Sequence, residues 1–114
     1  MFRPKSILIL LAVALVWPAN TVAQQKPALA QQVALGEVIV QRNCVACHSV
    51  RRGRSSPHPQ APSFRYLSQS YPVAALAEAL AEGIMTGHPD MPVFEFDAKA
   101  VDHIIAYLES IQDN

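Results

Sequence analysis

Apolar residues recur at helical spacing in three stretches of the chain, residues 29–44, 76–84 and 101–111. Such spacing is typical of amphipathic helices. No stretch shows the strict alternation of apolar and polar residues that marks a half-buried strand. The pattern therefore predicts an all-α fold of three to five helices. The first stripe consists of Leu29, Val33, Gly36, Val40 and Cys44.

Local signals predict where these helices begin and end. Residues 24–28 are polar and include a proline, which predicts a frayed tail before a helix that starts near Leu29. Ser63 is a candidate cap for a short helix over residues 64–67, and Pro72 suits the first turn of the next helix. Gly87 is a candidate left-handed cap at the end of that helix. Met85 lies in the helical pattern and is expected to pack against the core. Asp97 is expected to cap the last helix, which should run to about Ile111.

The apolar stripes of the first and last helices predict whether individual residues near them face the core or the solvent. Tyr107 is expected at the edge of the stripe, and His103 on the opposite, solvent-facing side. Gly36 interrupts the stripe of the first helix at a cost of roughly 1 kcal/mol relative to alanine. It is either a tolerated small residue or the point where another helix crosses. The stripe of the last helix consists of Val101, Ile104, Ile105, Leu108 and Ile111.

The first 23 residues have the layout of a secretory signal. Arg3 and Lys5 precede an apolar run over residues 7–16, and small residues end at Ala23. The run is too short for a spanning helix, which needs roughly 20 apolar residues. We expect cleavage near Ala23, an exported or periplasmic location, and a single domain over residues 24–114.

Charge excludes one class of partner. The whole chain has nine basic and nine acidic residues, and the part after the signal is slightly acidic because Arg3 and Lys5 lie in the signal. A general nucleic-acid binder is basic, so this class is excluded. Three arginines lie together at residues 51–54 in a proline-rich loop. They form either a solvated edge or a site for anionic groups.

The chemistry of the chain is concentrated in residues 44–48, which read Cys-Val-Ala-Cys-His. C-x-x-C-H is the attachment signal for c-type haem. Helical spacing places Cys44 and Cys47 one turn apart, so that two thioethers can hold one porphyrin while His48 binds its iron. A thioredoxin-like redox pair would need a strand before the motif, and a zinc site would need a second pair of ligands. A disulfide across so small a loop would stabilise little.

A second candidate ligand lies in the proline-rich segment after the middle helix. Met91 is followed by Pro92 and preceded by Pro89, which stiffen the backbone around a thioether. His88 is a competing ligand, since imidazole also binds haem iron. His58 lies between prolines in the earlier loop and is expected to be exposed.

Taken together, these features resemble the class I c-type cytochromes over residues 31–112. The resemblance implies a fold around one covalently bound haem c, with crossing N- and C-terminal helices that meet at Gly36 and Tyr107. It implies that Cys44 and Cys47 carry the haem, that His48 is the proximal ligand, and that Met91 binds the opposite face. Pro62 would accept a hydrogen bond from the ring of His48. The matching motifs are Gly36, the C-x-x-C-H motif, Ala61-Pro62, Gly83, Met91-Pro92 and Tyr107-Leu108.

The chain also departs from the family pattern. Its only tryptophan, Trp17, lies in the signal, so Tyr66, Tyr71 or an arginine of residues 51–54 is expected near a haem propionate instead. Lysines are also few after the signal, which argues against an extensive lysine docking ring.

The expected function is one-electron transfer by a small monomeric carrier rather than catalysis. Iron with two protein ligands has no open position for a substrate, and a His/Met pair raises the reduction potential. The expected partners are redox proteins, a donor dehydrogenase or membrane complex and an acceptor oxidase or reductase, with membrane contact only through them. Two alternatives remain: a haem sensor or peroxidase-like enzyme with a labile sixth ligand, and an electron-transfer subunit of a larger dehydrogenase or oxidase.

Overall fold

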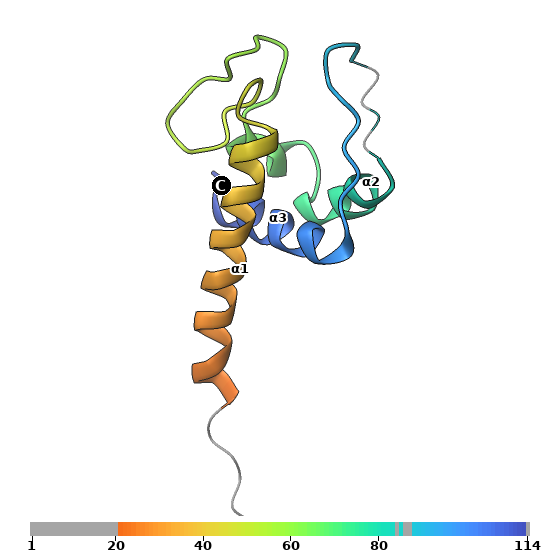
Figure 1. The fold of residues 1–114 in the computed structure, drawn as a ribbon. Helices are drawn as coiled ribbons and strands as arrows, with labels where there is room; N and C mark the ends of the chain where they lie inside the picture. Colours follow the sequence, from red (N-terminus) through yellow and green to blue (C-terminus); the bar gives the residue numbers. More distant parts are fainter. Residues whose placement is uncertain (1–20, 84, 86–87, 114) are drawn as a thin grey trace, which may run out of the picture.

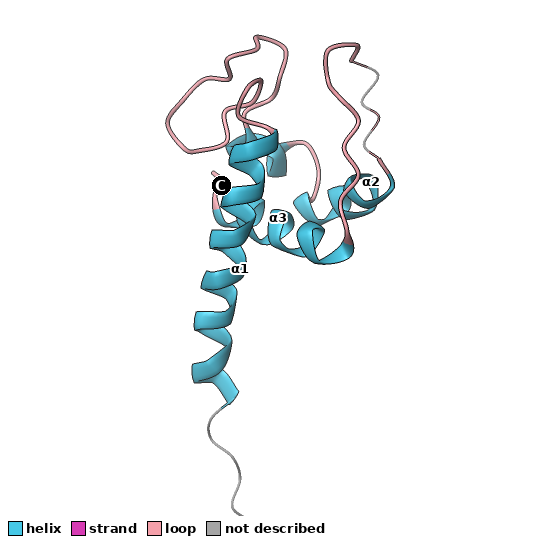
Figure 2. Ribbon diagram, viewed as in Figure 1, coloured by secondary structure: helices cyan, strands magenta, loops and turns pink. Residues whose placement is uncertain are grey.

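A computed structural model describes residues 21–83, 85 and 88–113 of the chain. This part contains three α-helices and two short 3-10 helices, joined by loops (Figures 1 and 2). The predicted all-α class is confirmed, since no strand occurs among the described residues. The helices, in chain order, are α1 (Thr21–Asn43), η1 (Phe64–Gln69), η2 (Val73–Ala75), α2 (Leu76–Glu82) and α3 (Ala98–Ser110).

The first helix begins earlier than its apolar stripe. α1 starts at Thr21, so the prediction of a frayed tail over residues 24–28 is wrong. These residues carry no apolar stripe. Glutamine, lysine and alanine have favourable intrinsic helix propensities, whereas Pro27 removes one hydrogen bond of the helix. Figure 1 shows this end of α1 extending away from the other helices. The helix runs across the predicted cleavage position after Ala23, and residues 1–20 lie outside the described part, so the signal remains a prediction.

The N- and C-terminal helices cross at Gly36, as the resemblance to class I c-type cytochromes implied. A Cβ atom added to Gly36 would lie 1.9 Å from the carbonyl oxygen of His103 and 2.8 Å from the Cβ of Tyr107. Only bare backbone fits at this position. Gly36 therefore marks the closest approach of α1 and α3, and the reading as a tolerated small residue is wrong.

At this crossing one expectation for α3 is confirmed and another needs correction. Tyr107 is buried where α3 meets Gly36 of α1, as the family resemblance implied, and its hydroxyl donates a 2.7 Å hydrogen bond to the carbonyl of Val50. His103 is half-buried rather than solvent-facing, with a buried Nδ1 that lacks a hydrogen-bond partner. The stripe alone could not place these residues, since α1 covers a face wider than the apolar one.

The hydrophobic core joins α1 and α3 to the short central helices. Val40 of α1 is fully buried, and Ile104 and Leu108 of α3 pack in the same cluster with Leu67 of η1 and Val73 of η2. Half-buried side chains surround this cluster. They are Val33, Ile39, Cys44, Phe64, Leu76, Leu80, Phe96, Ile105 and Ile111.

The predicted cap at the start of α3 is confirmed. Asp97 is the N-cap residue, and its Oδ1 accepts a 2.8 Å hydrogen bond from the backbone nitrogen of Ala100. Ser63 precedes the short helix η1 as expected, but its side chain makes no capping bond there. Its hydroxyl lies 3.4 Å from that of Ser56 instead.

The middle helix is shorter than predicted. α2 ends at Glu82, and Gly83 follows with φ of 98°. A positive φ is favourable for glycine and costly for other residues, so Gly83 ends the helix before Met85. Met85 is 84% exposed, which contradicts the prediction that it packs. The predicted cap Gly87 lies outside the described residues.

Two arginines of residues 51–54, Arg51 and Arg52, contact other parts of the protein surface. Arg51 forms a 2.9 Å ion pair with Glu37 of α1. Arg52 donates hydrogen bonds of 3.2 and 3.0 Å to the carbonyl oxygens of Ile111 and Gln112, just after α3. A cation at a helix C-terminus is favourable. These two side chains thus fasten the loop to both terminal helices.

Among the described residues, no helix combines the length and the hydropathy needed to cross a bilayer.

Candidate functional site

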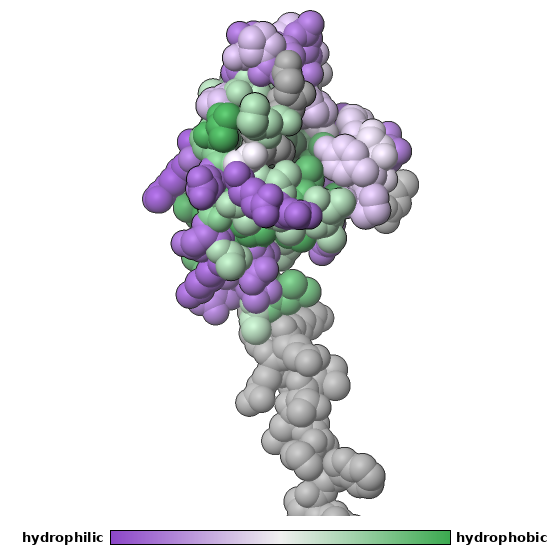
Figure 3. Space-filling model, turned by 90° about the vertical axis from the view of Figure 1, so that its right-hand side faces the viewer, coloured by the Kyte–Doolittle hydropathy of each residue, from purple (hydrophilic) through white to green (hydrophobic). Residues whose placement is uncertain are grey.

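The helices and loops enclose one large apolar cavity of about 410 Å³. Its lower wall is the core itself, with Val40, Leu67, Ile104 and Leu108. All five residues singled out in the sequence reach this cavity from three separate segments. They are Cys44, Cys47, His48, Pro62 and Met91. Figure 3 shows one face of the molecule, on which apolar residues gather over the middle of the body beside a row of hydrophilic residues.

The C-x-x-C-H motif forms a helical turn at the end of α1. The backbone nitrogen of Cys44 bonds to the carbonyl of Val40 at 2.9 Å, and that of His48 bonds to the carbonyl of Cys44 at 2.9 Å. Both bonds have the i to i−4 spacing of an α-helix. Cys44 and His48 are therefore one turn apart, as the sequence predicted, and both line the cavity.

The ring of His48 is held by a single backbone contact. Its Nδ1 lies 2.8 Å from the carbonyl oxygen of Pro62, which is the contact that the family resemblance implied. A carbonyl only accepts hydrogen bonds, so Nδ1 carries the proton and the neutral ring keeps its lone pair on Nε2. His48 is buried and its ring packs 4.6 Å from that of Phe64. The structure thus fixes the tautomer that a metal-binding imidazole needs.

Both cysteines are free thiols and do not form a disulfide. Burial raises the pKa of the Cys44 thiol to about 11, because the charged thiolate is poorly solvated in an apolar wall. At neutral pH this side chain is uncharged. A thioether carries no ionisable proton, so it suits this environment better than a thiolate does.

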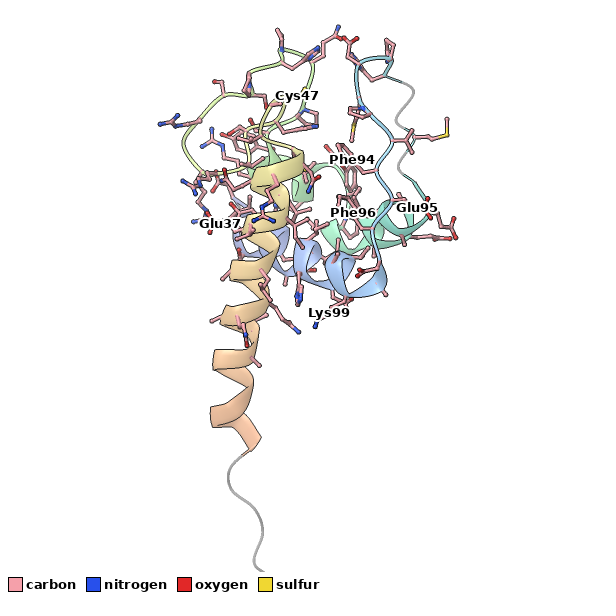
Figure 4. All side chains as sticks on the ribbon, viewed as in Figure 1. Glu37, Cys47, Phe94, Glu95, Phe96 and Lys99 are labelled. Carbon is pink, nitrogen blue, oxygen red and sulfur yellow. The ribbon has the colours of Figure 1, made fainter. Side chains whose placement is uncertain are left out.

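Met91 lies on the other side of the cavity, in the segment of residues 88–97 between α2 and α3. It is half-buried, and its backbone nitrogen bonds to the carbonyl of His88 at 3.2 Å. Further along, Phe94 and Phe96 lie on one side of the segment and Glu95 on the other (Figure 4). The two phenyl rings stack with centroids 5.9 Å apart and line the cavity. A 2.9 Å bond from the nitrogen of Phe96 to the carbonyl of Leu80 fastens the segment to α2.

Two histidines line the cavity, and one of them, His58, was not predicted there. His58 is half-buried and lines the cavity together with His88, so the expectation that His58 is exposed is wrong. The loop that carries His58 folds back toward the motif, where the backbone nitrogen of His58 donates a 3.1 Å hydrogen bond to the carbonyl of Cys47. Sequence spacing carries no signal for such a long-range fold of a loop.

Of the side chains considered for a propionate, Tyr71 alone lines the cavity among the described residues. Tyr66 is exposed and its ring carries the guanidinium of Arg65 at 4.3 Å. Arg51 and Arg52 are engaged with α1 and the end of α3. Tyr71 is therefore the candidate that the geometry retains.

The cavity fits a haem tethered at one edge. Its walls are mostly apolar and include leucine, isoleucine, valine and phenylalanine side chains, which suit an apolar macrocycle. Two thiols and an imidazole nitrogen with a free lone pair lie at one side, and a methionine thioether lies in the segment opposite. These are the side chains that c-type haem requires for attachment and iron binding.

Comparison with known families also indicates a c-type cytochrome. The model of the family described as "Cytochrome C oxidase, cbb3-type, subunit III" matches residues 31–108. The chain belongs to this family of c-type cytochromes. It therefore carries covalently bound haem c and has a role in electron transfer. Neither the curated proteins nor the solved structures gave a match.

Proposed function

We propose that this cytochrome is an exported one-electron carrier whose iron is bound by His48 and Met91. Cys44 and Cys47 hold the haem through thioethers, and Pro62 orients His48. When bound, the haem would supply the group through which electrons are exchanged with redox partner proteins. The observation that supports this proposal is the cavity itself, because Cys44, Cys47, His48 and Met91 all line it.

The protein residues have three tasks in this function. The bond from His48 Nδ1 to Pro62 keeps Nε2 available and fixes the plane of the ring. Met91 would be the second protein ligand of the iron, which would leave no open site for a substrate. The apolar walls, with Phe94 and Phe96, would exclude water and disfavour the net positive charge of the oxidised iron–porphyrin unit. When bound, haem supplies the one-electron couple, and both a methionine ligand and an apolar shell favour its reduced state.

Replacing Met91 tests the axial ligation. In Met91→Ala we expect a lower reduction potential, loss of the far-red band of methionine-bound ferric haem, and binding of added imidazole at the open position. Met85→Ala is a matched control, since Met85 is 84% exposed and lies outside the cavity lining. An unchanged spectrum and potential in Met91→Ala would exclude Met91 as the ligand and favour His88. Absence of the band in the unmodified protein would favour the sensor or peroxidase alternative.

A second candidate function is electron transfer inside a larger complex. The matched family is described as a subunit of an oxidase, and a domain of this kind could donate electrons within such an assembly. Export as a free monomer remains our first proposal, based on the signal over residues 1–23. Gel filtration after mild extraction of the exported fraction separates the two functions. A monomer supports the free carrier, and co-elution with an oxidase supports the subunit.

A further inference from the structure

Two loops that lie far apart in the sequence meet at the cavity through polar side chains. His58 and Gln60 belong to the loop of residues 49–63, and His88 and Asp90 belong to the segment of residues 88–97. The Nε2 of His58 lies 3.4 Å from Oδ2 of Asp90. The Nε2 of His88 contacts Oε1 of Gln60, and the two imidazole rings meet edge to face with centroids 5.3 Å apart. We call these four residues the clasp.

The backbone around the clasp decides where the ring protons lie. The nitrogen of Gln60 donates to Nδ1 of His58 at 3.2 Å, and the nitrogen of Asp90 donates to Nδ1 of His88 at 3.3 Å. An Nδ1 that accepts a bond carries no proton, so in the neutral ring the proton is on Nε2. Each Nε2 therefore donates across the gap, His58 to Asp90 and His88 to Gln60.

This arrangement argues against a metal ion at the clasp. Ligand atoms of His58, His88 and Asp90 lie within 4.8 Å of one another, which is the kind of cluster that can bind zinc. A metal on Nε2 would require the proton on Nδ1, and a metal-binding histidine usually donates that proton to an acceptor. Here both Nδ1 atoms face N–H donors instead. The clasp is built as a set of hydrogen bonds.

The position of the clasp links it to both sides of the haem site. The backbone nitrogen of His58 bonds to the carbonyl of Cys47 at 3.1 Å, and the backbone nitrogen of Met91 bonds to the carbonyl of His88 at 3.2 Å. The clasp therefore connects the turn that carries the attachment cysteines to the turn that carries Met91. Each histidine is one backbone hydrogen bond away from a residue of the site.

We propose that the clasp positions Met91 over the iron by holding residues 88–92 against the loop of residues 49–63. This inference rests on the proposed ligation by Met91. Residues 88–92 contain no helix, and Met91 is held within them by a single turn bond. Cross-links to a loop that is itself bonded to Cys47 restrict the positions that the thioether can reach. His58 and Asp90 are thus positioning residues that act on the sixth ligand through the backbone.

The test uses holoprotein with a substitution on the loop opposite Met91. His58→Ala removes the donor to Asp90, while His58→Gln retains an N–H donor of similar reach. Asp90→Asn retains an acceptor oxygen, and Gln69→Ala is a control at an exposed site outside the cavity lining. Two readouts are needed: the limiting rate at which imidazole replaces the sixth ligand of ferric haem, and the amide hydrogen exchange of residues 88–92.

We expect His58→Ala to raise the replacement rate by about fivefold, the factor that corresponds to the net loss of one hydrogen bond worth about 1 kcal/mol. Exchange of residues 88–92 should accelerate by a similar factor. His58→Gln, Asp90→Asn and Gln69→Ala should remain near the unmodified protein. Unchanged rate and exchange in His58→Ala would overturn the clasp. Faster exchange in a protein without the methionine band would support the clasp while refuting ligation by Met91.

Discussion

Gly36 of α1 lies directly against the backbone carbonyl of His103 in α3, and a methyl group added to Gly36 would come within 1.9 Å of that oxygen. The obstacle is backbone, so no side-chain rotation can relieve it. The two terminal helices would have to move apart. Their contact supports the core beneath the cavity, because Val40, one turn after Gly36, packs in the same cluster as Ile104, the residue after His103.

Gly36→Ala is therefore expected to destabilise the holoprotein, although alanine has the higher helix propensity. Overpacking of a tight contact typically costs about 1–3 kcal/mol and occasionally more, which exceeds the roughly 1 kcal/mol that alanine gains in a helix. The measurement is the free energy of unfolding in denaturant. Gln32→Ala, at an exposed position on the same helix, should change that free energy little. A more stable Gly36→Ala variant would contradict the close crossing.

Tyr107→Phe should remove one buried hydrogen bond without changing the packing. The tyrosine hydroxyl donates to the carbonyl of Val50 at 2.7 Å, and both residues are buried. A buried acceptor left without a partner costs about 1–3 kcal/mol. We expect the unfolding free energy to fall within this range. An unchanged stability would mean that water replaces the hydroxyl at Val50.

The same side chain should make stability depend on alkaline pH. Burial raises the pKa of Tyr107, and the nearby Glu37 carboxylate raises it further, while Arg51 opposes the shift. The unfolded tyrosine titrates near pH 10. Its contribution is therefore complete below about pH 10 and is lost as pH rises through the higher folded pKa. Tyr107→Phe should lack this loss, which denaturant unfolding at a series of alkaline pH values would measure.

Gly83→Ala should strain the junction between α2 and the Met91 segment. Gly83 has φ of 98°, and a Cβ there would lie 3.2 Å from Cγ1 of Val93. A non-glycine residue in such a conformation costs of order 1–3 kcal/mol. We expect lower stability of the holoprotein, read from denaturant unfolding, together with faster loss of the sixth ligand. Gly53 offers a comparison, since it also has a positive φ but no neighbour within 4 Å, so Gly53→Ala should affect stability alone.

Replacing both attachment cysteines should give a chain that does not retain haem. The haem forms the centre of a small core, and without it the cavity of about 410 Å³ would leave apolar walls in contact with water. We expect the Cys44→Ala/Cys47→Ala double variant to lose its pigment to acidified organic solvent and to show little helical signal by circular dichroism. A single Cys44→Ala or Cys47→Ala variant should keep one thioether and retain haem more weakly. A colourless double variant with full helical content would contradict this view.

The sequence alone determined the helical class, the haem motif and the segment that carries Met91. Each is encoded locally: apolar spacing defines a helix, two thiols one turn apart define an attachment site, and prolines define a stiff segment. The helix cap at Asp97 was likewise predicted from the local sequence, and the Asp97 side chain accepts the expected hydrogen bond from the backbone nitrogen of Ala100.

Only the tertiary structure decided which residues face the cavity and which face another helix. His103 was misplaced because α1 packs against the backbone of α3 at this residue, and no pattern within α3 reports that contact. His58 was expected in solvent, yet its loop folds back to Cys47 and toward Asp90. α2 ends at Gly83, where residues 93–96 run back along the helix. Val93 lies close to Gly83, and the backbone nitrogen of Phe96 donates a hydrogen bond to the carbonyl of Leu80. The burial of these residues is determined by contacts between segments that are distant in the sequence, and the composition of each segment does not reveal those contacts.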